Sequence, residues 1–458
     1  MHLVKGQEFR YSRGEFYQIE RHIVAPTPPK YLSRPANFVV RCAPGWVDLT
    51  ASELNELTAK PFGKYKFAPE IKVDKGAIHA TNVDFRQALD WTMRLRTAHD
   101  VEWLAWEGKC GSWRDLGKVC EALTASGFLP VQALAQLSDD ATKVHVAVKA
   151  NTSFVVTSGT IREKFLTGLG LKPAQPGDDA EAIFRFRLDL YRDRLRVLVS
   201  LGGDPLYKRG YKKHLASAAA PLPEHQAAAC IRSALSAMEN VAFDAVYVPF
   251  AGTGTLAFEW LSAHLELGSG SFGRGYAFES FAGFPATTVA HIRKKMTEIP
   301  PASAATPAII PPVLCVERNA EALADLRDNA DHFCTLAGID GKTIQVSGSD
   351  FFKADSETAL RIVASSGRRV LMLLNPPYGQ RLKTPGDAKK YFGRIASHIV
   401  DLEVRTGASF SGMCLIPEEP ASAAFVRALK TTHKSTTVHF THGGSDMRLV
   451  VFGSNSRS

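Results

Sequence analysis

The sequence lacks the marks of a secreted, disulfide-bonded or membrane-spanning protein. Its 458 residues include seven cysteines, an odd number, and no Cys-x-x-Cys pair, which argues against a disulfide framework and a structural zinc site. No apolar run approaches the roughly 20 residues needed to span a bilayer, and no secretory signal is visible at the N-terminus. We therefore expect a cytoplasmic protein with no metal site and no membrane contact. An organelle such as the mitochondrion is the alternative compartment.

Charge of both signs is present, with a moderate excess of positive charge. The chain carries 55 Lys and Arg against 46 Asp and Glu, a net charge of +9. An excess of this sign favours an acidic partner, and nucleic acid is the commonest one. Ordinary solubility charge is the alternative at this length.

Four segments follow one another along the chain. Residues 1–35 end in a proline-rich stretch and are predicted to form an N-terminal arm. Residues 36–205 carry short strand and helix patterns, which are typical of an α+β module. Residues 206–219 form a basic connector. From residue 220 to residue 458, strands alternate with helices, and this alternation predicts a parallel α/β sheet.

The stretch "VPFAGTGTLAFEW" (248–260) is the first candidate site. A strand ends there, Gly252 and Gly254 bracket a tight turn, and a helix begins at once. Glycine permits positive φ and lets a ligand approach the backbone, and a helix N-terminus offers unpaired N–H groups. The alternative is a turn that needs glycine only for its geometry.

Two carboxylates follow the next strands. Glu317 in "VLCVERNAEALADL" stands at the tip of the second strand of a βαβ unit, where it can accept hydrogen bonds from ribose hydroxyls. Asp350 in "SGSDFF" ends the following strand beside two aromatic residues, where it can bind an adenine amino group while a ring packs on the base. The alternatives are capping roles at the start of a helix.

The apolar run 371–374 stops at Asn375-Pro376-Pro377-Tyr378. Two prolines cannot continue a central strand, and the carboxyl end of a strand is where open α/β sheets bind ligands. The exocyclic amine of a nucleobase is a poor nucleophile because its lone pair is delocalised into the ring. The Asn375 side-chain oxygen and the Pro376 carbonyl can accept its two hydrogens and aim the lone pair at an electrophile. Tyr378 can stack on a base taken out of its helix.

The connector "GDPLYKRGYKKH" (203–214) gathers Lys208, Arg209, Lys212 and Lys213 around two tyrosines and a glycine. Basic clusters bind nucleic acid mainly through phosphate contacts. The four cations are therefore predicted to bind RNA. A solvated hinge is the alternative.

These motifs, in this order, resemble the class I, S-adenosylmethionine-dependent amino-methyltransferases. More specifically, the chain resembles the THUMP-domain methyltransferases that form N2-methylguanosine in bacterial large-subunit ribosomal RNA, the RlmL-like group. The stretches that carry this closer likeness are "FVVRCAPGWVDLTASEL", "FVVTSGTIREKF", "GGDPLYKRGYK", "APLPE" and "FGRGYAFESFAGF". The resemblance covers about residues 36–458.

The resemblance implies a Rossmann-like methyltransferase domain preceded by a ferredoxin-like plus THUMP RNA-binding module. It also implies S-adenosylmethionine as cofactor, and ribosomal RNA or a ribosome-assembly intermediate as partner. The target base would lie against Asn375, Pro376, Pro377 and Tyr378. The cofactor would contact Pro249, Phe250, Gly252, Gly254, Thr255, Glu317, Arg318, Asp350, Phe351 and Asn375. The chain departs from the family at Val248, where an acidic residue usually precedes the glycine loop, and at Tyr207, where histidine is usual.

Two alternatives stay open. "NPPY" suits the amine of adenine as well as that of guanine, so an N6-adenine methyltransferase is the second hypothesis. Val248 and the divergent THUMP stretch favour a third, a catalytically weakened RNA-binding factor in ribosome assembly.

Overall fold

The computed structural model describes most of the chain, with gaps between the described ranges. These ranges are 3–12, 15–24, 29–74, 76–129, 144–154, 157–171, 184–213, 222–239, 241–298, 310–353, 357–358, 360–361, 368–377, 387–417 and 419–455. For residues 3–24 the backbone alone is described.

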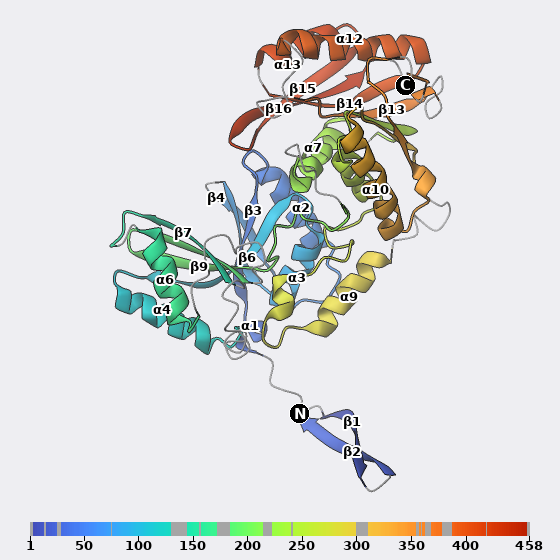
Figure 1. Cartoon of the computed structure of the whole chain (residues 1–458). Coiled ribbons are helices and arrows are strands. Elements are labelled where there is room, and N and C mark those ends of the chain that lie inside the picture. The colour runs from blue at the N-terminus through green and yellow to red at the C-terminus, as the bar shows by residue number, and fades with distance from the viewer. Residues whose placement is uncertain are drawn as a thin grey trace.

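The first of two seven-stranded sheets occupies the N-terminal half of the chain (Figure 1). Its strands are β3 (Ala36–Cys42), β4 (Glu70–Asp74), β5 (Ala77–Val83), β6 (Ala98–Lys109), β7 (Val144–Asn151), β8 (Phe184–Tyr191) and β9 (Arg194–Ser200). Their order is β4-β5-β3-β6-β9-β8-β7. β7 and β8 run parallel, and each other neighbouring pair is antiparallel. The helices are α1 (Lys30–Ser33), α2 (Val47–Ala59), α3 (Phe85–Arg94), α4 (Trp113–Ala125) and α6 (Ser158–Gly168).

Alternation of apolar and polar residues explains how this sheet buries one face. In β8, Phe184, Phe186 and Leu188 are buried, and the residues between them are partly exposed. A strand has a side-chain period of two, so this pattern places one face against the helices. Two alternating arms joined by "YRDR" in "AIFRFRLDLYRDRLRVLVSLGG" (182–203) predict a hairpin, and the antiparallel pairing of β8 with β9 confirms it.

Two segments of the first half differ from the sequence predictions. The predicted arm contains an antiparallel hairpin, β1 (Leu3–Ser12) with β2 (Glu15–Val24), which pairs backbone groups that an extended arm would leave to water. The apolar residues at three- and four-residue spacing in "VDFRQALDWTMRLRTAHD" (83–100) predict an amphipathic helix over this stretch, but the observed helix α3 ends at Arg94. The carboxylate of Glu53 accepts the backbone N–H groups of Arg96 and Thr97, so the chain leaves the helix there and enters β6.

The second sheet is a parallel sheet with an antiparallel edge. Its strands are β10 (Ala245–Pro249), β11 (Val313–Val316), β12 (Ile344–Ser347), β13 (Arg369–Leu374), β14 (Ser409–Ile416), β15 (His433–His442) and β16 (Ser445–Ser454). Their order is β12-β11-β10-β13-β14-β16-β15, with β16 antiparallel to both neighbours. The helices are α7 (Glu224–Ala237), α8 (Thr255–His264), α9 (Ala286–Thr297), α10 (Ala320–Ala337), α12 (Ala388–Thr406) and α13 (Glu419–Leu429).

Helices cover both faces of this sheet, as the predicted strand–helix alternation requires. Residues of α7, α8 and α10 form one hydrophobic cluster with the sheet, and residues of α12 and α13 form another. Within β13, Leu371 and Leu373 belong to the first cluster, while Met372 and Leu374 belong to the second. A strand buried on both faces reads as an unbroken apolar run. The predicted Rossmann-like α/β fold is therefore confirmed.

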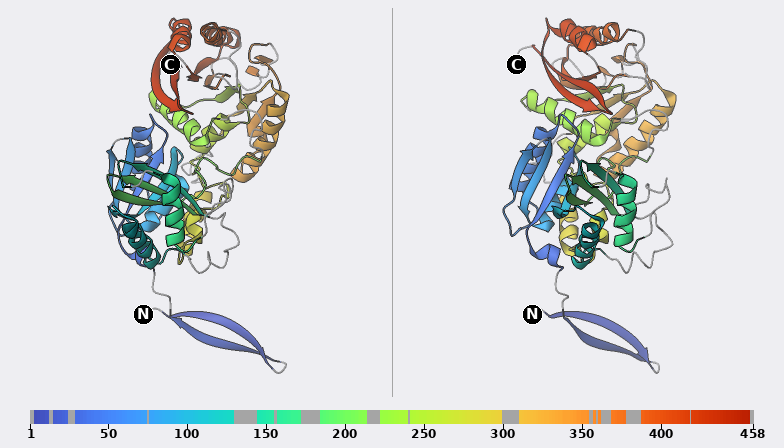
Figure 2. Two further views of the ribbon diagram at one scale, coloured as in Figure 1. Left: turned by 60° about the vertical axis from the view of Figure 1, so that its left-hand side comes forward. Right: turned by 90° about the vertical axis from the view of Figure 1, so that its left-hand side faces the viewer.

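The Gly/Pro/Ala-rich stretch 267–287, whose composition predicts an insertion or a loop, packs against both sheets. It contains a short 3₁₀ helix, η3 (Ala277–Ser280). Leu267 and Phe272 belong to a hydrophobic core of the second sheet, and Tyr276, Phe278 and Phe281 belong to that of the first. In the views of Figure 2 the first sheet lies below the second, with α7 between them.

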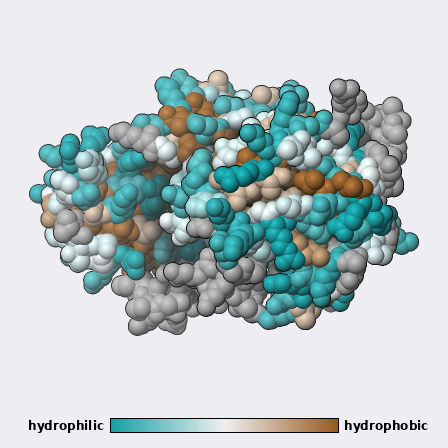
Figure 3. Space-filling view, turned by 90° about the horizontal axis from the view of Figure 1, so that it is seen from above, coloured by the Kyte–Doolittle hydropathy of each residue, from teal (hydrophilic) through white to brown (hydrophobic). Residues whose placement is uncertain are grey.

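The surface, the thiols and the helices add three simpler observations. Seen from the side of α12 and α13, the surface is mainly hydrophilic, and its apolar residues form small separate groups (Figure 3). Each of the seven cysteines is a free thiol. Within the described ranges, no helix has both the length and the apolar character that crossing a bilayer would need.

Candidate active site at the carboxyl edge of the parallel sheet

Parallel pairing brings the predicted site residues to one edge of the second sheet. Pro249 lies opposite Val316, and Val316 lies opposite Ser347, so the loops that follow β10, β11 and β12 begin side by side. On the other flank of β10, Tyr247 lies opposite Met372. The glycine loop, Glu317, Asp350 and Asn375 therefore emerge at the same edge. This is where open α/β sheets bind their ligands.

The glycine loop adopts a conformation that favours glycine. Phe250, Gly252 and Gly254 have positive φ angles of 62°, 54° and 98°. A Cβ atom on Gly254 would lie 2.4 Å from the ring of Phe258, so packing inside the domain requires this glycine. A Cβ atom on Gly252 would meet no atom of the described residues within 4 Å. The backbone at Gly252 thus faces open space, while Gly254 has a packing role.

Thr255 and Pro249 are enclosed by the protein. Thr255 is 7% exposed, and its hydroxyl accepts a 2.6 Å hydrogen bond from the ammonium group of Lys212. The same ammonium group pairs with Glu224 at 2.8 Å. Pro249 is the buried last residue of β10. These residues therefore shape the loop, and Lys212 and Glu224 support it from behind, a contact that no sequence motif had indicated.

Glu317 connects the end of β11 with the glycine loop. Its Oε2 accepts the backbone N–H of Gly252 at 2.9 Å, and its Oε1 accepts that of Asn319 at 2.8 Å. The carboxylate is thus fixed in position by two neutral donors. A carboxylate offers about four lone-pair sites, so two sites remain for the hydroxyls of a ligand.

Asp350 and its neighbours form the wall beyond β12. One carboxylate oxygen of Asp350 accepts the N–H of Phe352 at 3.0 Å, and the other pairs with Arg318 at 3.2 Å. Phe351 is only 3% exposed, and its ring lies 5.2 Å from that of Phe250. The prediction that the Phe351 ring packs on a base is not supported, because the protein covers this ring. Phe250 is the partly exposed ring of the pair.

Asn375 has a buried amide oxygen at the end of β13. Among the residues that the structure describes, this Oδ1 atom has no hydrogen-bond partner. Buried polar atoms are nearly always paired, and each exception calls for an explanation. Pro376 is buried and Pro377 is partly exposed. Tyr378, predicted to stack on the target base, lies outside the described residues.

The connector does not form an exposed cluster of four cations, and this corrects the sequence prediction. Arg209 is 2% exposed and pairs with Glu259 at 3.1 Å. Lys212 is enclosed behind the glycine loop, as described above. Their charged groups are turned inward, because each pairs with a buried carboxylate. Lys208 and Lys213 are at least partly exposed.

Glu259 on α8 joins the two halves of the molecule. It is 1% exposed and accepts hydrogen bonds from Arg209, from Tyr211 and from Arg96, which precedes β6. Burial alone raises the pKa of Glu259, but Arg209 and Arg96 outweigh it, and the pKa is lowered. Burial lowers the pKa of Arg209 and Glu259 raises it, with a net increase. Both groups therefore keep their charges.

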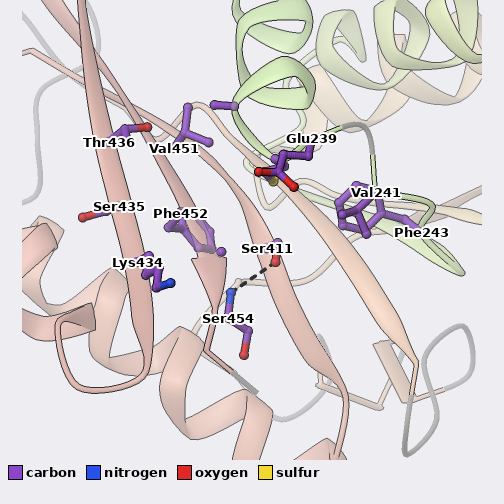
Figure 4. A pocket seen from close by; sticks show the side chains of 13 residues that line it. Glu239, Val241, Phe243, Ser411, Lys434, Ser435, Thr436, Val451, Phe452 and Ser454 are labelled. Carbon is purple, nitrogen blue, oxygen red and sulfur yellow. Dashed lines mark hydrogen bonds between the residues drawn. The ribbon is translucent and has the colours of Figure 1, made fainter. Parts of the chain in front are cut away.

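A cavity of about 350 Å³ lies at the opposite edge of the same sheet (Figure 4). Val241 and Phe243 precede β10, and Ser411 is the third residue of β14. The backbone N–H of Ser454 donates to Ser411 Oγ at 3.2 Å across it. These are the amino ends of the parallel strands, away from the edge where such sheets bind ligands. None of the predicted site residues lines this cavity.

Comparisons with known proteins agree with this geometry. No protein-family model matches the chain. Over 226 residues, which are 48% of this chain, it is 29% identical to the ribosomal RNA large subunit methyltransferase K/L of Methylococcus capsulatus. Over 280 residues, or 61% of the chain, it is 25% identical to the protein of the same name from Syntrophotalea carbinolica. These alignments span 27% and 36% of the relatives' own lengths.

Solved structures resemble nearly the whole chain. SMU.472, crystallised in complex with SAH, is 17% identical with a TM-score of 0.65, and the match covers 93% of this chain and 99% of that one. TrmN from Thermus thermophilus is 18% identical with a TM-score of 0.55, covering 91% and 99% of the two chains. At these identities the likeness shows the fold. The chain is thus a sequence relative of the ribosomal RNA large subunit methyltransferases K/L and has the fold of a class I methyltransferase.

Proposed function

We propose that the protein transfers a methyl group from S-adenosylmethionine to the exocyclic amine of a base in RNA, with N2 of guanine in large-subunit ribosomal RNA as the target. The observation that carries the proposal is the buried Asn375 Oδ1 at the carboxyl end of a central strand, which has no hydrogen-bond partner among the described residues. An unsatisfied buried acceptor costs free energy. A ligand that donates a hydrogen bond to this atom accounts for it.

The carboxyl edge of the sheet fits the cofactor. Gly252 has open space in front of its backbone, where the methionine portion can approach. Glu317, fixed by two backbone N–H groups, would accept the ribose hydroxyls. Asp350 would accept the adenine amino group beside the partly exposed Phe250. When bound, the cofactor supplies an electrophilic methyl group.

The chain's own contribution to the reaction is to hold and orient the amine. Asn375 Oδ1 and the Pro376 carbonyl would accept its two hydrogens, and this leaves the lone pair directed along the free side of the nitrogen. Because the two prolines fix the backbone in advance, little ordering remains for the reaction itself. Proximity and orientation of this kind account for a large part of many rate enhancements.

Two further observations support RNA as the substrate. The matched relatives are named as ribosomal RNA methyltransferases, and the chain carries a net charge of +9. In the connector, Lys213 is exposed, and Lys208 is exposed beside Asp204, with which it pairs at 3.2 Å; Lys213 is therefore the clearer candidate for a phosphate contact. A ribosomal substrate also supports the expected location, the cytoplasm or an organelle that contains ribosomes.

Nucleoside mass spectrometry of ribosomal RNA, from cells with and without this protein, tests the proposal. We expect loss of N2-methylguanosine in the deletion strain and its return with the wild-type gene but not with an Asn375→Ala gene. Loss of N6-methyladenosine instead would establish the adenine alternative. Unchanged nucleosides, together with no calorimetric binding of S-adenosylhomocysteine at millimolar concentration, would establish the assembly-factor alternative.

A further inference from the structure

Two exposed aromatic side chains lie at the same end of the first sheet. Among the large hydrophobic side chains of the described residues, Trp113 is 36% exposed and Tyr191 is 52% exposed, and the other exposed ones are aliphatic. Tyr191 ends β8, and Trp113 begins α4 just after the end of β6. An exposed tryptophan or tyrosine leaves apolar ring surface in water. Tyr191 lies on the face of β8 away from the helices and Trp113 stands on α4, so the two rings flank one end of the sheet and mark this end as a candidate binding surface.

The strand register places a row of residues across this end of the sheet. Asn151 of β7 lies opposite Tyr191 of β8, Tyr191 lies opposite Arg194 of β9, and Arg194 lies opposite Lys109 of β6. Paired residues in a sheet point to the same face. An aromatic ring and two cations therefore stand side by side on one face.

Trp113 is joined to this row through Phe154 and the β8–β9 turn. The rings of Trp113 and Phe154 lie 5.3 Å apart, nearly perpendicular. The N–H of Phe154 donates to the carboxylate of Asp193 at 2.8 Å, and the Asp193 carbonyl accepts the N–H of Cys110 at 2.7 Å. These bonds hold the turn, the loop after β7 and the start of α4 in one unit. We define the sheet-end surface as the following ten residues at this end of the sheet: Lys109, Trp113, Arg114, Lys149, Asn151, Phe154, Lys164, Tyr191, Arg192 and Arg194.

The six cations of the sheet-end surface are exposed, and none forms an ion pair with another described residue (Lys109, Arg114, Lys149, Lys164, Arg192 and Arg194). A hydrogen bond from Ser112 is the main cause that lowers the pKa of the Asp115 carboxyl, and Lys109 lies near enough to contribute to this shift. The neighbouring acids Asp115 and Asp193 accept backbone N–H groups instead. Farther along the same sheet, by contrast, Arg41 and Arg187 both pair with the buried Glu102.

Cations also lie over both exposed rings. Lys164 Nζ is 5.2 Å from the centre of the Trp113 ring, and Arg192 Cζ is 5.1 Å from that of Tyr191. Arg192 and Asp193 both have positive φ, 49° and 55°, at turn positions where Asn-Gly is usual. A non-glycine residue there is strained. The turn thus carries an arginine beside Tyr191 where glycine would cost less.

We propose that the sheet-end surface binds single-stranded RNA, with bases stacked on Trp113 and Tyr191 and phosphates on the unpaired cations. This proposal rests on the proposed function in that RNA is the partner. Stacking on aromatic side chains within a basic surface is how proteins bind single strands without reading their sequence. α4 and α6 lie on the side of the molecule away from β13 and β14 (Figure 1). The surface would therefore contact RNA remote from the base that reacts.

Binding of a short single-stranded oligouridylate tests the proposal. Trp113→Ala and Tyr191→Ala should each weaken binding about 5- to 150-fold, whereas Tyr191→Phe, which keeps the ring, should stay within about twofold of wild type. Lys109→Gln with Arg194→Gln should make the slope of log affinity against log salt shallower by about 0.7 for each phosphate that the variant no longer neutralises. Val404→Ala and Lys430→Gln, exposed residues of the other half, serve as matched controls and should bind as wild type does.

Fluorescence gives a readout that a merely structural role would not change. Of the six tryptophans, Trp113 is the only exposed one. Stacking of a base on its ring should therefore quench the tryptophan emission. Trp113→Phe should remove this quenching while retaining part of the affinity for the oligouridylate. Wild-type affinity in both alanine variants would overturn the proposal, as would equal binding of a duplex of the same length or no binding by wild type. Binding of S-adenosylhomocysteine, measured on the same variants, should not change. If the wild-type protein binds the oligouridylate through Trp113 and Tyr191 but transfers no methyl group, the proposed function is refuted and the RNA-binding proposal stands.

Discussion

Replacing Glu259 with glutamine removes one negative charge from a buried group that contains two arginines. Glu259 and Arg209 are 1% and 2% exposed, and the carboxylate also bonds Arg96 at 2.8 Å. Removing one partner of a buried ion pair leaves an uncompensated charge, at a cost of about 3–5 kcal/mol. Glutamine can still accept one hydrogen bond through its amide oxygen. We therefore expect the free energy of unfolding to fall by about 3 kcal/mol, near the lower limit.

The dependence on pH has a defined sign. The pKa of Glu259 is lowered, because Arg209 and Arg96 outweigh the opposing effect of burial. Such a carboxyl stabilises the fold above its unfolded pKa, about 4.3 for glutamate, and loses this contribution as the pH falls through the lower folded value. The difference in the free energy of unfolding between wild type and Glu259→Gln should therefore be largest at neutral pH and should decrease in acid.

Urea unfolding should be followed by both tryptophan fluorescence and far-UV circular dichroism, since a chain of this size need not unfold in two states. The double variant Arg209→Met with Glu259→Leu should recover only part of the loss, because it removes the buried pair but leaves Arg96 and the buried Tyr211 hydroxyl without their acceptor. Glu298→Gln removes an exposed carboxylate beside Lys295 and should leave the free energy of unfolding essentially unchanged, because exposed ion pairs contribute little. If Glu259→Gln unfolds within about 1 kcal/mol of wild type by both probes, the reasoning is refuted.

Three further predictions concern the carboxyl edge. Asn375→Ala should lower the turnover of methyl transfer about 100-fold or more, because the amine is no longer oriented, with a much smaller change in its calorimetric affinity for S-adenosylhomocysteine, since Asn375 is one of ten predicted cofactor contacts; turnover within a few-fold of wild type contradicts this role. Glu317→Ala should weaken that affinity at least about tenfold, since charge-assisted hydrogen bonds to the ribose are lost, and equal affinity would count against the assignment. Val248 is fully buried in a hydrophobic cluster, and burial of a carboxylate there is costly. Val248→Asp should therefore lower the free energy of unfolding by about 2–5 kcal/mol. Tighter cofactor binding by a stable Val248→Asp protein would show that the pocket accepts the acid.

Local patterns in the sequence predicted most of the second sheet, and physical reasons explain this. Strands β10 and β13 are short apolar runs that end at Pro249 and just before Asn375-Pro376, and α10 begins after its N-cap Asn319 and ends before Gly338. Each signal is contained in a few consecutive residues. Because parallel pairing brings strand ends to one edge, the shared position of Glu317 and Asn375 follows from the fold as well.

What the sequence did not predict depends on contacts between distant residues. The cluster "KRGYKK" looks like a solvated basic patch, yet Arg209 and Lys212 reach carboxylates 50 and 12 residues farther along the chain. A glutamate inside the apolar helix "TLAFEWL" was the signal for the first of these contacts. Phe351 was expected to be open to a base because it follows a strand end, but the packing of Phe250 against it is visible only in three dimensions.

The buried group around Glu259 also limits how such a chain can be recombined. Its carboxylate comes from the parallel-sheet half, Arg96 from the first half, and Arg209 from the segment between them. A fragment that begins near residue 220 would keep Glu259 but lose Arg96 and Arg209, so the buried carboxylate would have no counterion. The complementary fragment would keep both guanidinium groups without the carboxylate. Exchange of either half with a homologue should therefore succeed only when these three positions are inherited together.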